Sequence, residues 1–131
     1  AILYNNASPI FMDTDEYFNI NVNKTVEFIK KETYYKNGYT YNKITKKKIV
    51  SIIIVHVFGN PANIFDLYKI CKKRNIKIIE DCAESLGSSY KNKINSHTGT
   101  IGDFGCFSFN GNKIITTSSG GMIALKKKSD F

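Results

Sequence analysis

The feature that most constrains the fold of this chain is an alternation of strand patterns with amphipathic helix patterns. The apolar run 49–58 has the length of a buried strand. A turn at Gly59-Asn60-Pro61 and a helical pattern capped by Asn63 follow, and residues 76–79 form a second strand pattern. Because a helix separates the two strands, we expect them to lie parallel with a right-handed crossover. The alternation predicts an α/β fold with a mostly parallel sheet and flanking helices.

The remaining segments predict further elements of the same fold. Residues 9–13 indicate a short strand, and a helix opened by Asn21 is expected to end near Asn37-Gly38. Residues 103–109 and 121–125 indicate two more strands. The sheet is therefore expected to contain about five strands.

Length and cysteine content narrow the class of protein. A chain of 131 residues with 42% hydrophobic composition is expected to form one domain, and it contains no apolar run of the roughly 18 residues that a membrane span needs. Cys71, Cys82 and Cys106 are odd in number and form no Cys-x-x-Cys pair, which argues against a disulfide framework and a zinc site. We expect free thiols in a reducing cytoplasm.

The net charge of +8 raises the possibility of a nucleic-acid-binding module. Of the 19 basic residues, however, only Arg74 is an arginine that can make forked contacts to phosphate or guanine. The lysine runs 46–48 and 126–128 lack interleaved aromatic residues. These runs are predicted to be solvated surface, and no nucleic-acid partner and no membrane partner is expected.

Polar residues follow two of the predicted strands, where ligands of parallel sheets bind. Asp81 follows the strand 76–79, and Ser108 and Lys113 follow the next strand. A carboxylate, a hydroxyl and an amine at strand ends would serve many kinds of site. One of them is a site for pyridoxal 5'-phosphate (PLP), which needs an anion at its ring nitrogen, donors for its phosphate and an amine for covalent attachment. Each residue also has a plainer interpretation, since Asp81 can cap a helix, Ser108 can stabilise a turn and Lys113 can be a solvated turn residue.

Four motifs combine these polar residues with glycines. They are Glu80-Asp81-x-Ala83-Glu84, Gly99-Thr100-x-Gly102-Asp103, Phe107-Ser108-Phe109-x-x-x-Lys113, and Thr116-Thr117 before Gly120-Gly121-Met122. Together they resemble the DegT/DnrJ/StrS family of PLP-dependent nucleotide-sugar aminotransferases, which belongs to PLP fold type I. Weaker similarity at 9–13 and 56–61 extends the resemblance over essentially the whole chain.

The resemblance implies a fold and a set of site residues. Residues 1–131 would be part of the large PLP-binding domain, with an N-terminal segment and a C-terminal small domain absent and with a homodimer as the full-length protein. Lys113 would carry the cofactor and move the proton between substrate and cofactor, and Asp81 would bind the pyridine nitrogen. Ser108 would donate to the cofactor phosphate, and Glu84 lies where the family usually places Gln or His against the ring.

The resemblance also implies an activity. The full-length protein would transfer an amino group, with L-glutamate as amino-acid donor, to a nucleotide-linked 4-keto sugar in surface-glycan precursor biosynthesis. Three other functions stay open. A related PLP-dependent sugar dehydratase has histidine in place of the lysine, so Lys113 argues against it; a cofactor-binding homologue without aminotransferase activity and a nucleic-acid-binding module are the others.

Several positions differ from the family pattern or have no assigned function. An ionised Glu84 can only accept hydrogen bonds, so it would repel a phenolate unless it is protonated or turned toward another donor. Ser118-Ser119 stands where relatives have glycine, so a position suited to positive φ carries a side chain. The loop 94–98 is a few residues longer than usual. His56 ends a buried strand and is predicted to be a structural histidine.

Overall fold

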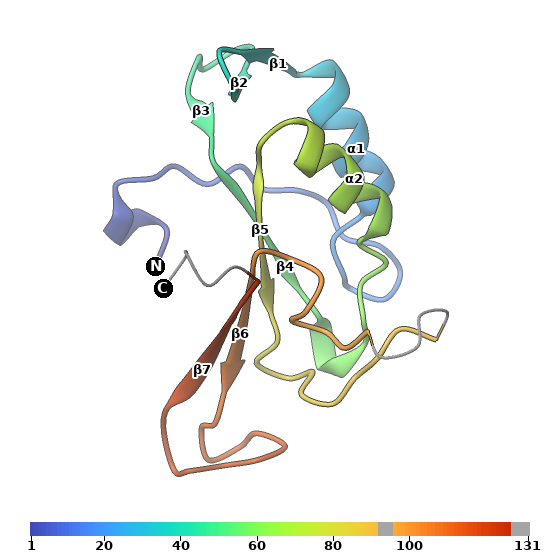
Figure 1. Cartoon of the computed structure of the whole chain (residues 1–131), viewed down its shortest axis with the longest axis vertical. Coiled ribbons are helices and arrows are strands. Elements are labelled where there is room, and N and C mark those ends of the chain that lie inside the picture. The colour runs from blue at the N-terminus through green and yellow to red at the C-terminus, as the bar shows by residue number, and fades with distance from the viewer. Residues whose placement is uncertain (92–95, 127–131) are drawn as a thin grey trace.

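The computed structural model describes residues 1–91 and 96–126, and its central layer is a four-stranded sheet (Figure 1). The strands lie in the order β4 (Ser51–Val55), β5 (Lys77–Asp81), β6 (Phe104–Ser108) and β7 (Gly121–Leu125). Strands β4, β5 and β6 are parallel, and β7 is antiparallel to β6. The predicted α/β fold with a mostly parallel sheet is confirmed, although this sheet has four strands where about five were predicted.

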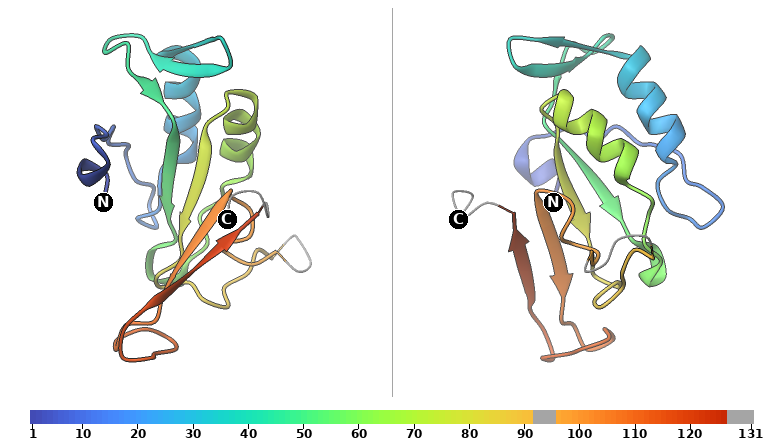
Figure 2. Two further views of the ribbon diagram at one scale, coloured as in Figure 1. Left: turned by 60° about the vertical axis from the view of Figure 1, so that its left-hand side comes forward. Right: turned by 45° about the vertical axis from the view of Figure 1, so that its right-hand side comes forward.

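Two helices, α1 (Val22–Lys31) and α2 (Phe65–Lys73), lie on the same side of this sheet (Figure 2). The predicted cap of α1 is confirmed, because the Asn21 side chain accepts a hydrogen bond from the Lys24 N–H at 3.0 Å. The predicted cap of α2 is wrong: Ile64 precedes the helix without a side-chain cap, so Asn63 is not at that position. Within the described ranges, no helix is both long and apolar enough to cross a membrane.

The core lies between α2 and the sheet. Apolar side chains of α2 that repeat at helical spacing meet alternate residues of β4 and β5, as expected for a helix packed on a strand layer. The most buried large apolar side chains of this core are Ile54, Ile64, Leu67, Cys71 and Ile78, and Ile29 of α1 also belongs to it. The core therefore holds α2 against one face of the sheet, and it does not cover the carboxyl ends of the strands.

The segment after α1 forms a small second sheet, and residues 33–36 of it were predicted to continue the helix. Its strands are β1 (Thr33–Lys36), β2 (Tyr39–Asn42) and β3 (Lys48–Ile49), all antiparallel. Asn37 and Gly38 both have positive φ, at 51° and 81°, and form the two-residue turn of the β1–β2 hairpin. Asn-Gly between aromatic strand formers is a hairpin signal, and the rings of Tyr34 and Tyr41 stack across the strands at 5.4 Å.

Residues 9–13 do not form the predicted strand. In this region only an isolated bridge occurs, between Thr14 and Ile20. Ile10 and Phe11 are 46% and 90% exposed. A short apolar segment becomes a strand only when a neighbouring strand takes its hydrogen bonds, and no strand within the described ranges pairs with this one.

The sheet face opposite the helices is apolar and exposed. Neither α1 nor α2 covers it (Figure 2). Ile53 and Val55 of β4 are 40% and 42% exposed on this face. Ile123 of β7, which the strand register places on the same face, is 64% exposed. Apolar residues of β4 therefore lie on both faces of the strand, which is the pattern of a strand in an α/β sheet with two covered faces.

The cysteines are free, as predicted. Cys71 and Cys82 are buried, and desolvation raises the pKa of the Cys71 thiol to about 12 and that of the Cys82 thiol to about 11. Both thiols are therefore neutral at physiological pH, and a neutral thiol is a poor nucleophile and a poor metal ligand.

Two features discussed from the sequence lie partly outside the described residues. These are the long loop 94–98, of which residues 94 and 95 are not described, and the lysine run 126–128, of which 127 and 128 are not described.

Asp103 ties the start of β6 to the neighbouring strand and helix. Its side chain is 4% exposed, accepts a hydrogen bond from the Ile78 N–H at 3.0 Å, and forms ion pairs with Lys72 at 3.3 Å and Lys77 at 3.2 Å. Burial alone would raise the pKa of Asp103, but these three partners outweigh it and hold the pKa below its ordinary value of 3.8.

Because the pKa of Asp103 is lowered by folding, the free energy of unfolding depends on pH. The folded state binds protons more weakly than the unfolded state, so the contribution of Asp103 is present at neutral pH and is lost as pH falls below about 3.8. We expect Asp103→Asn to lower the free energy of unfolding of the full-length protein by about 1–3 kcal/mol at pH 7 and to make its acid dependence less steep. Thermal unfolding from pH 7 to pH 3 measures both effects. The control is Asp66→Asn, an exposed carboxylate on α2, and equal effects of the two variants would contradict this role of Asp103.

Candidate active site

The residues singled out from the sequence lie at the carboxyl end of the parallel strands. Asp81 is the last residue of β5, with Val55 of β4 and Cys106 of β6 as its Cα partners. Ser108 ends β6, two residues beyond the partner of Asp81. In Figure 1 these strand ends lie at one end of the sheet, together with the loop that joins β6 to β7. This is the end where open parallel sheets bind ligands.

Lys113 lies in the loop between β6 and β7. Its backbone N–H donates to the Asn110 carbonyl oxygen at 3.0 Å, and its side chain is only 18% exposed. The Nζ atom lies 4.0 Å from Oε1 of Glu84. Two segments that are distant in the sequence thus meet here, and Lys113 is not the fully solvated turn residue of the plainer interpretation.

A hollow of about 280 Å³ surrounds this ion pair. It is lined by Phe58, Glu84, Asn112, Lys113 and Ile114. The structure therefore brings Glu84 and Lys113 together at one opening. Sequence reasoning missed Phe58, although its place directly after a buried strand and before Gly59-Asn60-Pro61 is a signal that points to this end of the sheet.

Glu84 is turned toward a hydrogen-bond donor. This is one of the two arrangements expected for a carboxylate at this position, the other being a protonated carboxyl. Its Oε2 atom accepts a hydrogen bond from the Phe58 N–H at 3.0 Å. Phe58 has a left-handed backbone conformation, with φ of 53°, inside the turn Val57–Gly59 (η2). One carboxylate oxygen thus binds the backbone after β4, and the other lies nearer to Lys113.

Asp81 and Ser108 each keep hydrogen-bonding capacity. Oδ1 of Asp81 accepts from the Ala83 N–H at 3.1 Å, and Oδ2 takes no hydrogen bond from the residues that the structure describes. The Ser108 Oγ accepts from the Asn110 N–H at 3.4 Å, so its own hydrogen remains available to another acceptor. Asp81 does not cap a helix, because the described residues contain no helix between β5 and β6, and its bond to Ala83 is local. Ser108 does stabilise a turn, as its plainer interpretation predicts. Each side chain keeps an atom that is available for a further hydrogen bond.

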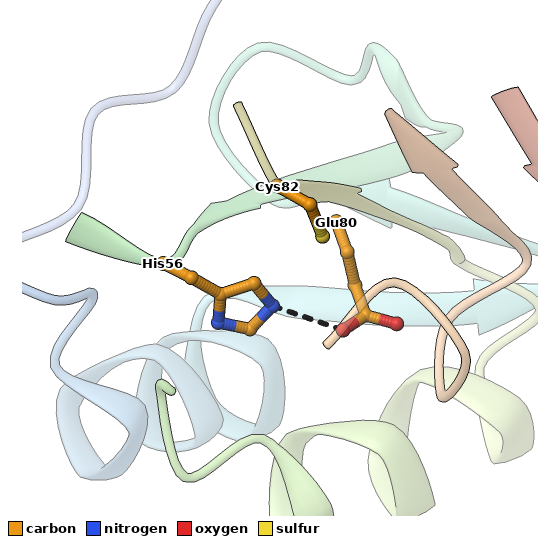
Figure 3. Close-up of side chains that lie close together, drawn as sticks. All are labelled: His56, Glu80 and Cys82. Atoms are coloured by element: carbon orange, nitrogen blue, oxygen red, sulfur yellow. Dashed lines mark hydrogen bonds and ion pairs between the residues drawn. The ribbon is translucent and has the colours of Figure 1, made fainter. Parts of the chain in front are cut away.

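His56 and Glu80 form a buried pair behind this end of the sheet (Figure 3). Both side chains are completely buried, and His56 Nε2 lies 2.9 Å from Glu80 Oε2. With Cys82 they form a group of metal-ligand types whose atoms lie within 4.8 Å of one another. Both ring nitrogens and both carboxylate oxygens already take part in hydrogen bonds, in agreement with the structural role predicted for His56.

Comparison with known proteins identifies the family. The sequence model of the DegT/DnrJ/EryC1/StrS aminotransferase family matches residues 1–129. This chain belongs to that family. It is 37% identical over 129 residues to GDP-perosamine synthase of Escherichia coli O157:H7. The alignment covers 98% of this chain and 30% of that relative.

Two further matches, a curated relative and a solved structure, also involve PLP. The putative pyridoxal phosphate-dependent aminotransferase EpsN of Bacillus subtilis strain 168 is 42% identical over 122 residues, covering 93% of this chain and 28% of EpsN. The structure of E. coli GDP-4-keto-6-deoxy-D-mannose-3-dehydratase with bound hydrated PLP matches with a TM-score of 0.67 and 28% identity, covering 90% of this chain and 26% of that one. The chain thus spans less than one third of the length of these relatives.

Ser118 of this family member has the backbone conformation expected from the sequence. Its φ is 70°, in the left-handed region that favours glycine, and its N–H donates to Thr116 Oγ1 at 2.9 Å. The Phe109 N–H closes the loop by donating to the Gly120 carbonyl oxygen at 2.9 Å. A serine therefore holds a strained position in the loop that carries Lys113.

Proposed function

We propose that the full-length protein is a PLP-dependent aminotransferase that moves an amino group from L-glutamate to a nucleotide-linked 4-keto sugar for surface-glycan precursors. The observation that carries this proposal is the placement of the Lys113 amine, largely buried and facing Glu84, at the sheet end where Asp81 and Ser108 also lie. Membership of an aminotransferase family supports it. So do relatives named as a GDP-perosamine synthase and as a pyridoxal phosphate-dependent aminotransferase.

The described residues fit the chemistry of PLP. Lys113 supplies a primary amine for covalent attachment. Asp81 has an oxygen without a hydrogen-bond partner among residues 1–91 and 96–126, which suits a protonated ring nitrogen. Ser108 has a free hydroxyl hydrogen, which suits a phosphate oxygen. A dianionic phosphate needs more donors than one hydroxyl, and the full-length protein would supply the others.

When bound, PLP supplies an electron-withdrawing ring that accepts the electron pair released during transfer of the amino group. Asp81 would hold the proton on the ring nitrogen, which keeps that ring electron-poor. The Lys113 amine would hold the cofactor and later carry a proton at its Nζ atom. Glu84, fixed by the Phe58 N–H, would lie beside the Lys113 amine and orient it toward the hollow.

The rival functions are less well supported. A dehydratase has histidine in place of the lysine, whereas this chain has Lys113. A nucleic-acid-binding module does not account for family membership over residues 1–129. A homologue that binds PLP without transferring amino groups would share every residue discussed above, so activity has to be measured.

For the whole protein, we propose that residues 1–131 are part of the large PLP-binding domain. A further N-terminal segment and a small C-terminal domain would complete the subunit, and a homodimer in the cytoplasm would be the working form. The exposed apolar sheet face at Ile53, Val55 and Ile123 supports a larger domain, because such a face is normally covered.

Purified full-length protein tests the function when it is incubated with PLP, L-glutamate and GDP-4-keto-6-deoxymannose or another nucleotide-linked 4-keto sugar. We expect 2-oxoglutarate and a nucleotide-linked amino sugar in equal amounts, identified by mass spectrometry. A 3-deoxy sugar product would identify a dehydratase. Absence of turnover with a range of 4-keto sugars, in protein that binds PLP, would support the inactive homologue.

A further inference from the structure

Glu80 is a completely buried carboxylate that does not line the hollow around Lys113. Its Oε1 atom accepts hydrogen bonds from the backbone N–H groups of Ile101 at 2.8 Å and Gly102 at 2.5 Å. Its Oε2 atom accepts from the Gly99 N–H at 2.9 Å and lies 2.9 Å from His56 Nε2. Burial alone would raise the pKa of Glu80, but the hydrogen bonds from His56, Gly102 and Gly99 outweigh it and hold the pKa below 4.5, so the group is ionised.

The protonation of His56 follows from its partners. Its Nδ1 atom lies 3.1 Å from the Ala62 backbone nitrogen, whose N–H can only donate, so Nδ1 carries no proton. The ring proton is therefore on Nε2 and points to Glu80 Oε2 (Figure 3). His56 is a neutral ring in a single tautomer, held between the backbone before α2 and the Glu80 carboxylate.

These contacts join the end of β4 to the two strands, β5 and β6, that end in the candidate cofactor residues Asp81 and Ser108. His56 follows β4, and its backbone N–H donates to the Asp81 carbonyl oxygen at 3.1 Å. Glu80 lies on β5 directly before Asp81, and the loop that it binds leads into β6. The glycines of that loop permit the close approach, since a Cβ atom on Gly102 would lie 2.9 Å from the Ile78 carbonyl oxygen.

Adjacent residues of a strand point to opposite faces. Glu80 therefore points to the helix-covered side, whereas Asp81 points to the other side. A shift of Glu80 along or around the strand moves Asp81 with it, because the two share one peptide unit. Burial of an ionised carboxylate costs desolvation free energy, and an apolar residue of similar size would often give equal or greater stability. The presence of Glu80 in the core therefore favours a role beyond stability.

We propose that His56 and Glu80 are positioning residues that set the location of Asp81 for the cofactor through the His56 Nε2–Glu80 contact. This inference rests on the proposed PLP-binding function. Replacing a residue that orients a metal ligand through a hydrogen bond typically changes metal affinity by about 10- to 100-fold, and we expect an effect of that order here. The effect should therefore be visible in cofactor binding, independently of turnover.

Two substitutions of His56 separate its two contacts. In His56→Gln, the longer amide reaches the place of Nε2 and can donate to Glu80, while the acceptor for Ala62 is lost. In His56→Asn, the short amide reaches only the place of Nδ1 and can accept from Ala62, while the donor to Glu80 is lost. Each variant removes the imidazole ring and keeps one of the two hydrogen bonds of His56. The two variants should therefore have similar stability, and each serves as the control for the other.

The experiment measures the Kd of PLP for full-length protein by absorbance, together with the absorption maximum of the bound PLP and the melting temperature without PLP. We expect His56→Asn to raise Kd about tenfold or more and to shift the absorption maximum. We expect His56→Gln to stay within about threefold of wild type with an unshifted maximum, at a melting temperature similar to that of His56→Asn.

Equal Kd values for the two variants, whether both resemble wild type or both are weakened, would overturn the inference, as would the reverse order. In each of these cases the proposed function survives, because wild-type protein binds PLP. If wild-type protein does not bind PLP, the proposed function fails and the inference fails with it.

Discussion

Lys113→Ala is expected to lower kcat for amino transfer at least about 1,000-fold, because no second amine can take over covalent attachment and proton transfer at the same position. Among the described residues, the hollow is lined by Phe58, Glu84, Asn112 and Ile114 besides Lys113, and none of these carries an amine. The measurement is the rate of 2-oxoglutarate formation in full-length protein at saturating L-glutamate and PLP.

The control for Lys113→Ala is Lys69→Ala on α2, a lysine whose side chain is 72% exposed and paired with Asp66. Its turnover should equal that of wild type, since an exposed helix lysine does not contact the strand ends. A Lys113→Ala protein that retains more than about one tenth of wild-type turnover would show that another group performs the reaction.

Asp81→Asn is expected to remain loaded with cofactor at saturating PLP but to lower kcat about 100-fold or more. A neutral amide cannot hold a proton on the ring nitrogen by charge, and removal of one preorganised electrostatic partner typically has an effect of that size. Asparagine keeps an oxygen that can accept from the Ala83 N–H, so the local turn should survive. Steady-state kinetics and PLP absorbance on the same preparation separate the two quantities.

Asp66→Asn is the matched control, because Asp66 is an exposed aspartate whose pKa is lowered by hydrogen bonding to Lys69. It should change neither PLP content nor kcat. If Asp81→Asn turns over at a rate near that of wild type, the electrostatic role belongs to a different residue.

Much of the central sheet could be predicted from the sequence because its strands have strong local signals. The run Ser51–Val55 is long, apolar and β-branched, and the helix after it forces a parallel return to Lys77–Asp81. The hairpin at Asn37-Gly38 was mistaken for a helix end, because Asn-Gly also ends helices and the preceding α1 pattern is strong. The distinction depends on cross-strand pairing of Tyr34 with Tyr41, a non-local contact.

The candidate site could be predicted as a set of residues but not as an arrangement. Motif spacing indicates Asp81, Ser108 and Lys113, and parallel strands bring their ends together. The hydrogen bond from Phe58 to Glu84 depends on a left-handed backbone at Phe58, which a phenylalanine rarely adopts and which no sequence pattern predicts. The tautomer of His56 likewise depends on Ala62, six residues later in the segment before α2.

The identity of the cofactor-bearing lysine is the central claim, and chemical trapping tests it most directly. Full-length protein with bound PLP is treated with borohydride, which fixes the cofactor to its amine, and the labelled peptide is sequenced by mass spectrometry. We predict a single label on Lys113, in the peptide that contains Ser108-Phe109-Asn110-Gly111 before it. A label on any other lysine, or PLP released intact after reduction, would contradict the account.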